Sequence, residues 1–226
     1  MEFLTQTKQY IRNQFPSLFT VLKKLRNVPG LAHMNALASP ITERFDASKE
    51  DDAYFKKYMD EVIRTINSLP HAGELLDIGC GHGFATQMLA ELPRVTNVVA
   101  LDKVPRDYFH YLDNPKITFY SEDITSFDFS PWVDRFDAVV STEFVEHISE
   151  HDGEVLVQNV FKVVKPGGYF IGSTPLNPTQ DNLFTHNPFH IREYQPSVFK
   201  KILEQVGFRT IVIKELGDCF VWIAQK

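Results

Sequence analysis

The sequence predicts an α/β fold, with helices on both faces of a doubly wound and mostly parallel sheet. Two observations point to this class: short apolar runs follow one another between residues 74 and 174, and helical patterns separate them. A third is a loop with three glycines, Gly79, Gly81 and Gly83, which stands between the first apolar run and the first of these helices. In open α/β sheets, ligands bind outside the carboxyl ends of the strands, where such loops lie.

The glycine loop belongs to the stretch E-L-L-D-I-G-C-G-H-G-F-A-T, residues 74–86. Asp77 stands near the end of the apolar strand, and a helix is expected over residues 84–92. Because glycine lacks a Cβ atom, the loop can turn sharply and a ligand can lie against its backbone. The N–H groups at the start of the helix point into the same space. A dinucleotide-binding fingerprint would need G-x-G-x-x-G, but Phe84 takes the place of its last glycine.

The residues that follow three further apolar runs stand where parallel strands would end. They are Asp102 and Lys103 after residues 98–101, Asp123 and Ile124 after residues 117–120, and Thr142 and Glu143 after residues 136–140. A carboxylate such as that of Asp102 can accept hydrogen bonds from both hydroxyls of a ribose. The turn K-P-G-G, residues 165–168, precedes a fifth strand expected over 169–172, and a hairpin of residues 210–215 and 219–224 completes the sheet.

This order and spacing resembles the class I S-adenosylmethionine (SAM)-dependent methyltransferases, in which the loop reads D-x-G-x-G-x-G. The resemblance implies a Rossmann-like, seven-stranded sheet whose last strand is antiparallel, with SAM as the cofactor. It also implies the cofactor-binding residues: Asp77, Gly79, Cys80, Gly81 and Gly83 at the methionine end, Asp102 and Lys103 at the ribose, Asp123 and Ile124 at the adenine, and Thr142. Cys80 is expected to be a small packing residue rather than a nucleophile.

The unit E-F-V-E-H, residues 143–147, follows the fourth strand. If the backbone is helical there, Glu143, Glu146 and His147 come close to one face, and such a set suits Mg²⁺, Mn²⁺ or Zn²⁺. The unit is similar to that of ubiquinone-pathway O-methyltransferases and of small-RNA 3′-terminal 2′-O-methyltransferases. That resemblance implies a metal that holds the hydroxyls of the substrate, with His190 completing the ligands. Alternatively, Glu146 and His147 simply begin a helix.

Methyl transfer to an alcohol needs a base for the hydroxyl proton. His147 and His190 are the candidates, because imidazole titrates near neutral pH, and Glu143 is a further catalytic candidate. His186 could take the place of His190, since both lie in the same irregular segment. We favour a site without a metal, in which His190 lies near the acceptor.

The chain divides into an N-terminal helical extension or cap, residues 1–47, and a methyltransferase domain, residues 48–226, with a substrate-side insert or lid at 176–196. A helix from Ser48 to Leu69 is expected to open the domain. In residues 1–30, five basic residues against one acid give a charge of +4. A cap packed on the sheet is favoured over contact with a membrane or a protein partner.

Composition narrows the function further. The net charge of −6 argues against nucleic acid as the main partner. No apolar stretch is long enough to span a membrane, no signal-peptide pattern is present, and two distant cysteines, Cys80 and Cys219, suggest a cytoplasmic location. We expect O-methylation of a small acceptor such as a sugar, a nucleotide-linked sugar or glycan, or a phenol. The alternatives are a metal-dependent RNA 2′-O-methyltransferase and a SAM-binding interaction module without activity.

Overall fold

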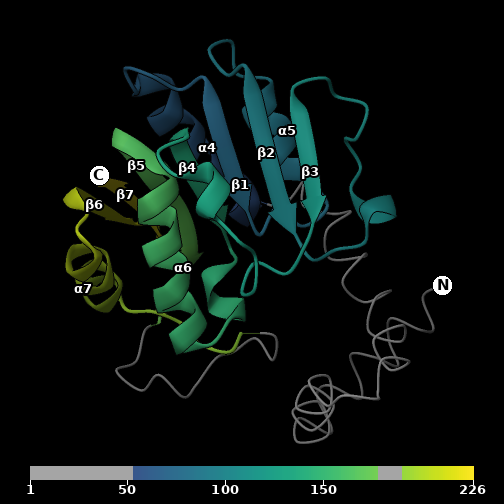
Figure 1. Ribbon diagram of the computed structural model, residues 1–226. Coiled ribbons are helices and arrows are strands. Elements are labelled where there is room, and N and C mark those ends of the chain that lie inside the picture. Colours follow the sequence, from purple (N-terminus) through teal and green to yellow (C-terminus); the bar gives the residue numbers. More distant parts are fainter. Residues whose placement is uncertain (1–52, 178–189) are drawn as a thin grey trace, which may run out of the picture.

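The computed structural model describes residues 53–177 and 190–226, and these form a single seven-stranded sheet in the order β3-β2-β1-β4-β5-β7-β6 (Figure 1). The strands are β1 (Glu74–Ile78), β2 (Asn97–Asp102), β3 (Ile117–Ser121), β4 (Phe136–Thr142), β5 (Val164–Pro175), β6 (Arg209–Glu215) and β7 (Cys219–Gln225). Strands β1 to β5 pair in parallel, and β7 runs antiparallel to both of its neighbours. The predicted sheet and its antiparallel last strand are confirmed.

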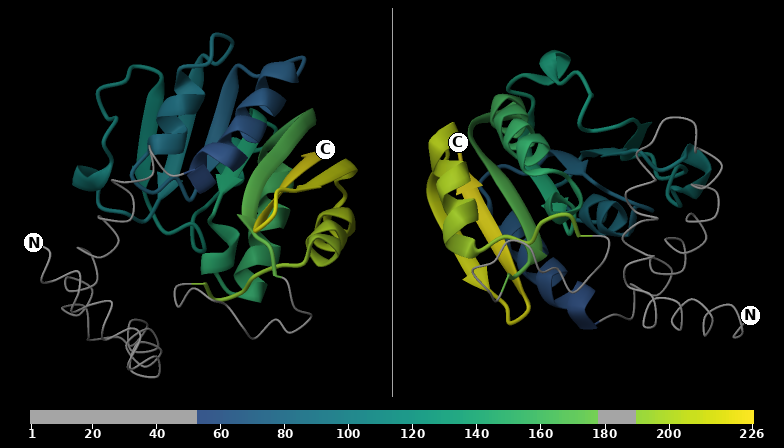
Figure 2. Two further views of the ribbon diagram at one scale, coloured as in Figure 1. Left: turned by 180° about the vertical axis from the view of Figure 1, so that it is seen from behind. Right: turned by 90° about the horizontal axis from the view of Figure 1, so that it is seen from below.

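Helices cover both faces of the sheet, so the chain is doubly wound as predicted. Helices α4 (Ala53–Ser68) and α5 (Phe84–Ala90) lie on one face, and α6 (Glu150–Val163) and α7 (Pro196–Val206) lie on the other (Figure 2). Tyr58, Met59, Val62 and Ile66 form the buried stripe of α4, at the three- and four-residue spacing of an amphipathic helix.

The order of the strands places the glycine loop, which follows β1, in the middle of the row of carboxyl strand ends. β1 pairs with β2 on one side and with β4 on the other. The chain therefore adds β2 and β3 on one side of β1, and then returns to add β4 and β5 on the other side. The carboxyl ends of β1, β2 and β4 therefore lie side by side at the point where the strand order reverses, which is where α/β sheets of this kind bind ligands. The residues expected to bind the cofactor lie at or just after these ends, apart from Asp123 and Ile124, which follow β3.

The fifth strand differs from its prediction. It begins at Val164, before the K-P-G-G unit, and Phe136 pairs with Val164 while Ala138 pairs with Tyr169. Residues 165–168 therefore form a bulge inside the strand rather than a turn before it. A left-handed Gly167, with φ of +78°, allows the backbone to make this bulge.

Several expectations fall outside the described residues. They are the cap formed by residues 1–47, the start of the first helix at Ser48, His186, and most of the insert at 176–196. Among the residues that the structure does describe, no helix is both long and apolar enough to cross a membrane.

Candidate functional site: a cofactor crevice beside a glutamate–histidine cluster

The glycine loop has the backbone that its sequence predicts. Gly79, Gly81 and Gly83 all have positive φ, at +73°, +54° and +93°. Side chains crowd two of these positions, because a Cβ on Gly79 would lie 2.2 Å from Cγ of Phe144 and one on Gly83 would lie 2.6 Å from Cε2 of Phe109. Only glycine satisfies both the backbone angle and this space, so neither position can carry a side chain.

Asp102 connects the end of β2 to the glycine loop. Its Oδ2 atom accepts a hydrogen bond from the backbone N–H of Gly81 at 2.9 Å, and Oδ1 accepts one from Val104 at 3.0 Å. Each carboxylate oxygen can accept a second hydrogen bond, so ribose hydroxyls can still be bound. Lys103, the next residue, is exposed.

Asp77 lies in the last part of β1 and is only 1% exposed. Its Oδ2 atom accepts a hydrogen bond of 2.6 Å from the Thr86 hydroxyl, on α5. Burial, opposed by this hydrogen bond and reinforced by the nearby charge of Asp102, raises the pKa of Asp77 from 3.8 to about 7. Burial, followed by the charges of these two acids, also raises the pKa of Cys80 well above its ordinary value. Cys80 is thus unsuited to act as a nucleophile, as expected.

The expected adenine residues follow β3. Asp123 is exposed, and its Oδ1 atom accepts hydrogen bonds from the backbone N–H and the hydroxyl of Thr125, at 3.0 and 2.8 Å. Burial acts to raise the pKa of Asp123, but the bonds from Thr125 and the charge of Lys103 outweigh it and the pKa is lowered. Asp123 therefore offers an ionised acceptor at this edge, while Ile124 is buried in the core.

The E-x-x-E-H unit does not form a continuous helix. Glu143 has a left-handed backbone, with φ of +51°, and the short 3-10 helix η4 (Val145–His147) begins two residues later. Glu143 instead turns toward β5, where Oε1 accepts a hydrogen bond of 2.9 Å from the Ser173 hydroxyl. The expectation that Glu143 shares one helical face with Glu146 and His147 is therefore wrong.

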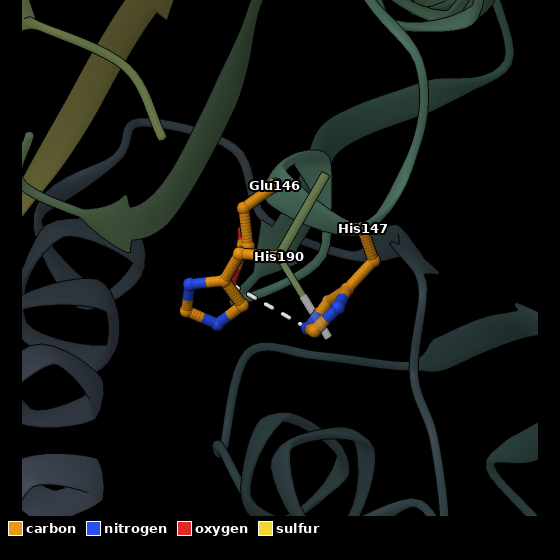
Figure 3. A group of neighbouring side chains, drawn as sticks. All are labelled: Glu146, His147 and His190. Atoms are coloured by element: carbon orange, nitrogen blue, oxygen red, sulfur yellow. Dashed lines mark ion pairs between the residues drawn. The ribbon is translucent and has the colours of Figure 1, made fainter. Parts of the chain in front are cut away.

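Glu146, His147 and His190 form a cluster (Figure 3), which we call the Glu–His cluster. One carboxylate oxygen and one ring nitrogen of each histidine lie within 4.8 Å of one another, and the two imidazole rings are 5.1 Å apart between centroids. Glu146 is fully buried, and its Oε2 atom accepts a hydrogen bond of 2.9 Å from Thr174 on β5. The set contains the later histidine that the sequence suggested, but not Glu143.

The segment that carries His190 is fixed against η4. The carbonyl oxygen of Glu146 accepts hydrogen bonds from the backbone N–H groups of Ile191 and Arg192, at 2.7 and 3.1 Å. The guanidinium of Arg192 lies 4.7 Å from the centre of the Tyr194 ring and 2.6 Å from the Glu150 carboxylate. These contacts bring His190 to residues more than forty positions earlier in the chain.

Sequence reasoning missed Glu193. Its Oε1 atom lies 2.7 Å from Nδ1 of His190, and the two side chains are 7% and 10% exposed. A carboxylate can only accept a hydrogen bond, so this contact requires a proton on Nδ1, and in the neutral imidazole the lone pair is then on Nε2. The signal was present in the sequence, as a histidine followed three residues later by a glutamate.

The described residues fit SAM. The three glycines of the loop have positive φ, and the carboxylate of Asp102 accepts a hydrogen bond from Gly81 within this loop. Asp77 lies just before the loop and is buried. Its Oδ1 atom has no hydrogen-bond partner within the described part of the chain. Thr142, at the end of β4, is half-buried beside them.

Known proteins are similar to this chain in sequence and in fold. Residues 51–213 match a family model described as a methyltransferase domain. A probable S-adenosylmethionine-dependent methyltransferase of Mycolicibacterium smegmatis is 28% identical over 183 residues, which cover 77% of this chain and 68% of that protein. The ubiquinone biosynthesis O-methyltransferase of Cereibacter sphaeroides is 33% identical over 110 residues. The match covers 47% of this chain and 43% of that enzyme. This chain thus spans less than half the length of that enzyme.

A solved structure of similar fold is the 1,6-didemethyltoxoflavin-N1-methyltransferase of Burkholderia thailandensis, with bound 1,6-didemethyltoxoflavin and S-adenosylhomocysteine (SAH). It has a TM-score of 0.66 at 18% identity, and the superposition covers 85% of this chain and 89% of that protein. The N-methyltransferase NodS of Bradyrhizobium japonicum has a TM-score of 0.63 at 18% identity, with coverages of 78% and 89%. By its family match, its loop and its sheet, the chain belongs to the methyltransferase-domain family and is a SAM-dependent methyltransferase.

Proposed function

We propose that the protein transfers the methyl group of SAM to an oxygen atom of a small organic acceptor, such as a sugar, a nucleotide-linked sugar or a phenol. The contact between His190 and Glu193 carries this proposal, because it prepares an imidazole to take a proton from a hydroxyl group. The ubiquinone biosynthesis O-methyltransferases among the relatives support oxygen over nitrogen. A cytoplasmic location, suggested by the two distant cysteines, belongs to the same proposal.

The position of the Glu–His cluster supports its role. Phe144, between the end of β4 and η4, packs directly on Gly79 of the glycine loop. The segment of residues 143–147 therefore borders the crevice in which the cofactor is expected. SAM supplies a methyl group already activated by a positively charged sulfur, so the protein mainly has to align and desolvate the reacting atoms.

In this proposal His190 is the general base. With its Nδ1 proton donated to Glu193, its Nε2 atom can accept the hydroxyl proton of the acceptor. The buried carboxylate orients the ring and stabilises the imidazolium that forms. His147 is half-exposed, and its ring stands nearly perpendicular to that of His190. It lines the other side of the position that an acceptor would take.

A second candidate adds a divalent ion to the same cluster. One carboxylate and two imidazoles suit Mg²⁺, Mn²⁺ or Zn²⁺, and a histidine that binds a metal commonly donates its other ring N–H to a carboxylate, as His190 does to Glu193. Glu146, His147 and His190 would hold the ion, which would bind the hydroxyls of the acceptor. Glu143 takes no part in this set.

One experiment tests both versions. The purified protein is incubated with SAM carrying a labelled methyl group and with a panel of sugars, nucleotide-sugars, phenols and short RNAs. Each reaction is run with and without EDTA. Transfer to a small hydroxyl compound that resists EDTA supports the base, and transfer that EDTA abolishes and added metal restores supports the ion. Labelling of RNA alone, or of amines alone, contradicts the proposed acceptor.

A further inference from the structure

We propose that Asp77 senses the charge of the cofactor. Its carboxyl group holds a proton in the cofactor-free protein, loses the proton to solvent when SAM binds, and keeps it when SAH binds. SAM carries a sulfonium, whereas SAH has a neutral thioether and is otherwise of equal charge. The proposal rests on SAM binding at the glycine loop and goes beyond it by giving Asp77 a role in telling cofactor from product.

The surroundings of Asp77 disfavour a charge. The side chain is 1% exposed, and its neighbours in the sheet are Ala100 and Val140. Oδ2 accepts one hydrogen bond, from Thr86, and Oδ1 accepts none from the residues that the structure describes. A buried carboxylate is normally compensated by several hydrogen bonds or a cation. Here the neutral acid is the less costly form.

The ionisable groups that act on Asp77 strengthen this preference. From β2, the charge of Asp102 raises the pKa of Asp77, and from α5 only the hydroxyl of Thr86 lowers it. Cys80, in the loop, interacts with Asp77 as another potential anion. No cation figures among these groups, and burial is the largest of the effects that bring the pKa to about 7.

A bound cation would reverse this balance. Asp77 stands two residues before Gly79, and Asp102 ties Gly81 to the same corner of the crevice. A unit positive charge within about 8 Å, at an effective dielectric constant of about 20, changes the ionisation equilibrium of a carboxyl group by about tenfold or more. The protonated carboxyl then becomes a carboxylate, and one proton passes to the buffer. SAH lacks the sulfonium and so adds no net positive charge, and the proton stays.

This coupling predicts that pH changes the preference between the two molecules. Below neutral pH, SAM must displace a proton and its affinity falls, whereas the affinity for SAH does not depend on the protonation of Asp77. The ratio of the Kd of SAH to that of SAM should therefore rise by up to about tenfold between pH 6 and pH 8. At the higher pH the protein retains its substrate cofactor better than its product.

Titration calorimetry in buffers of different ionisation enthalpy counts the protons released on binding. Near pH 7 we expect roughly half a proton released with SAM and none with SAH. In infrared difference spectra, the C=O band of a protonated carboxyl should be lost on adding SAM and retained on adding SAH. Neither readout requires turnover.

Three variants sharpen the test. Asp77→Asn should abolish the difference in proton release between SAM and SAH. Thr86→Val removes the hydrogen bond that lowers the pKa of Asp77, so the release should move to higher pH. Asp123→Asn is the control: this acid also lies at the expected cofactor site, but its pKa is lowered and it stays ionised throughout, so the release should persist.

Equal proton release for SAM and SAH would overturn the proposal. So would a difference that survives Asp77→Asn, because a group other than Asp77 would then release the proton. Either result, obtained while SAM still binds, leaves the methyltransferase assignment intact. A failure of the wild-type protein to bind SAM would instead count against that assignment.

Discussion

The carboxylate of Asp102 and the backbone N–H of Gly81 are joined by a hydrogen bond of 2.9 Å, which links the end of β2 to the loop after β1. One side chain therefore shapes the glycine loop, and it is the same side chain to which the resemblance assigns the ribose. Its Oδ1 atom also accepts from Val104, so the carboxylate is held in place before any ligand arrives. A site held in this way loses little entropy when the cofactor binds.

Asp102→Ala should weaken SAM binding by about 1–3 kcal/mol, because it removes a charge-assisted hydrogen bond to the ribose and frees the loop. Titration calorimetry measures the effect. Asp102→Asn keeps one oxygen acceptor at the same place and should lose less. An unchanged Kd in the alanine variant would refute the ribose assignment.

Gly79→Ala should destabilise the fold by at least about 3 kcal/mol, since the new methyl group meets Phe144 and the residue must keep a positive φ. Gly167→Ala is the matched control: its φ is also positive, at +78°, but nothing lies within 4 Å of the added Cβ. Gly167→Ala should lower the free energy of unfolding by only about 1–2 kcal/mol, because only the strain of a positive φ remains. Chemical denaturation compares the two, and equal losses would contradict the crowding by Phe144.

His190→Ala should lower kcat by about 10²–10⁴-fold, the usual contribution of a general base, with partial recovery at high pH as the acceptor ionises unaided. Glu193→Gln should also lower kcat, by a smaller factor, because the amide no longer stabilises the imidazolium. His151→Ala is the control, as this histidine is exposed in the first turn of α6. Full activity of both His147→Ala and His190→Ala would eliminate the base.

Asp77 should make the stability of the cofactor-free protein fall as pH rises. Burial raises the pKa of Asp77 to about 7 in the folded chain, against the ordinary value of 3.8 that the unfolded chain restores, so its contribution is fully present below pH 3.8 and is lost as pH rises through about 7. The amide of Asp77→Asn does not titrate, so the stability of this variant relative to wild type should rise by up to about 4 kcal/mol between pH 3.8 and about pH 7. Urea unfolding at pH values from about 4 to about 8 gives the two profiles, and parallel profiles would contradict a raised pKa.

The elements predicted well are those encoded by residues close together in the chain. Alternation of apolar runs and helical patterns indicated the strands. The glycines at 79, 81 and 83 specify the conformation of the loop without reference to its packing. The bulge at residues 165–168 could not be predicted in this way, because it depends on which residues of β4 pair with β5.

By itself, then, the sequence determined the order of the elements, the bare backbone of the loop and the acid of β2 that faces it, since strand period, glycine backbone angles and chain direction are local properties. Only the tertiary structure decided which side chains form the Glu–His cluster. Glu143 turns away because its backbone is left-handed and Ser173 binds it, while His190 joins Glu146 through backbone hydrogen bonds from the next two residues. Contacts across more than forty residues depend on how the strands pack, and no periodicity in the sequence specifies them.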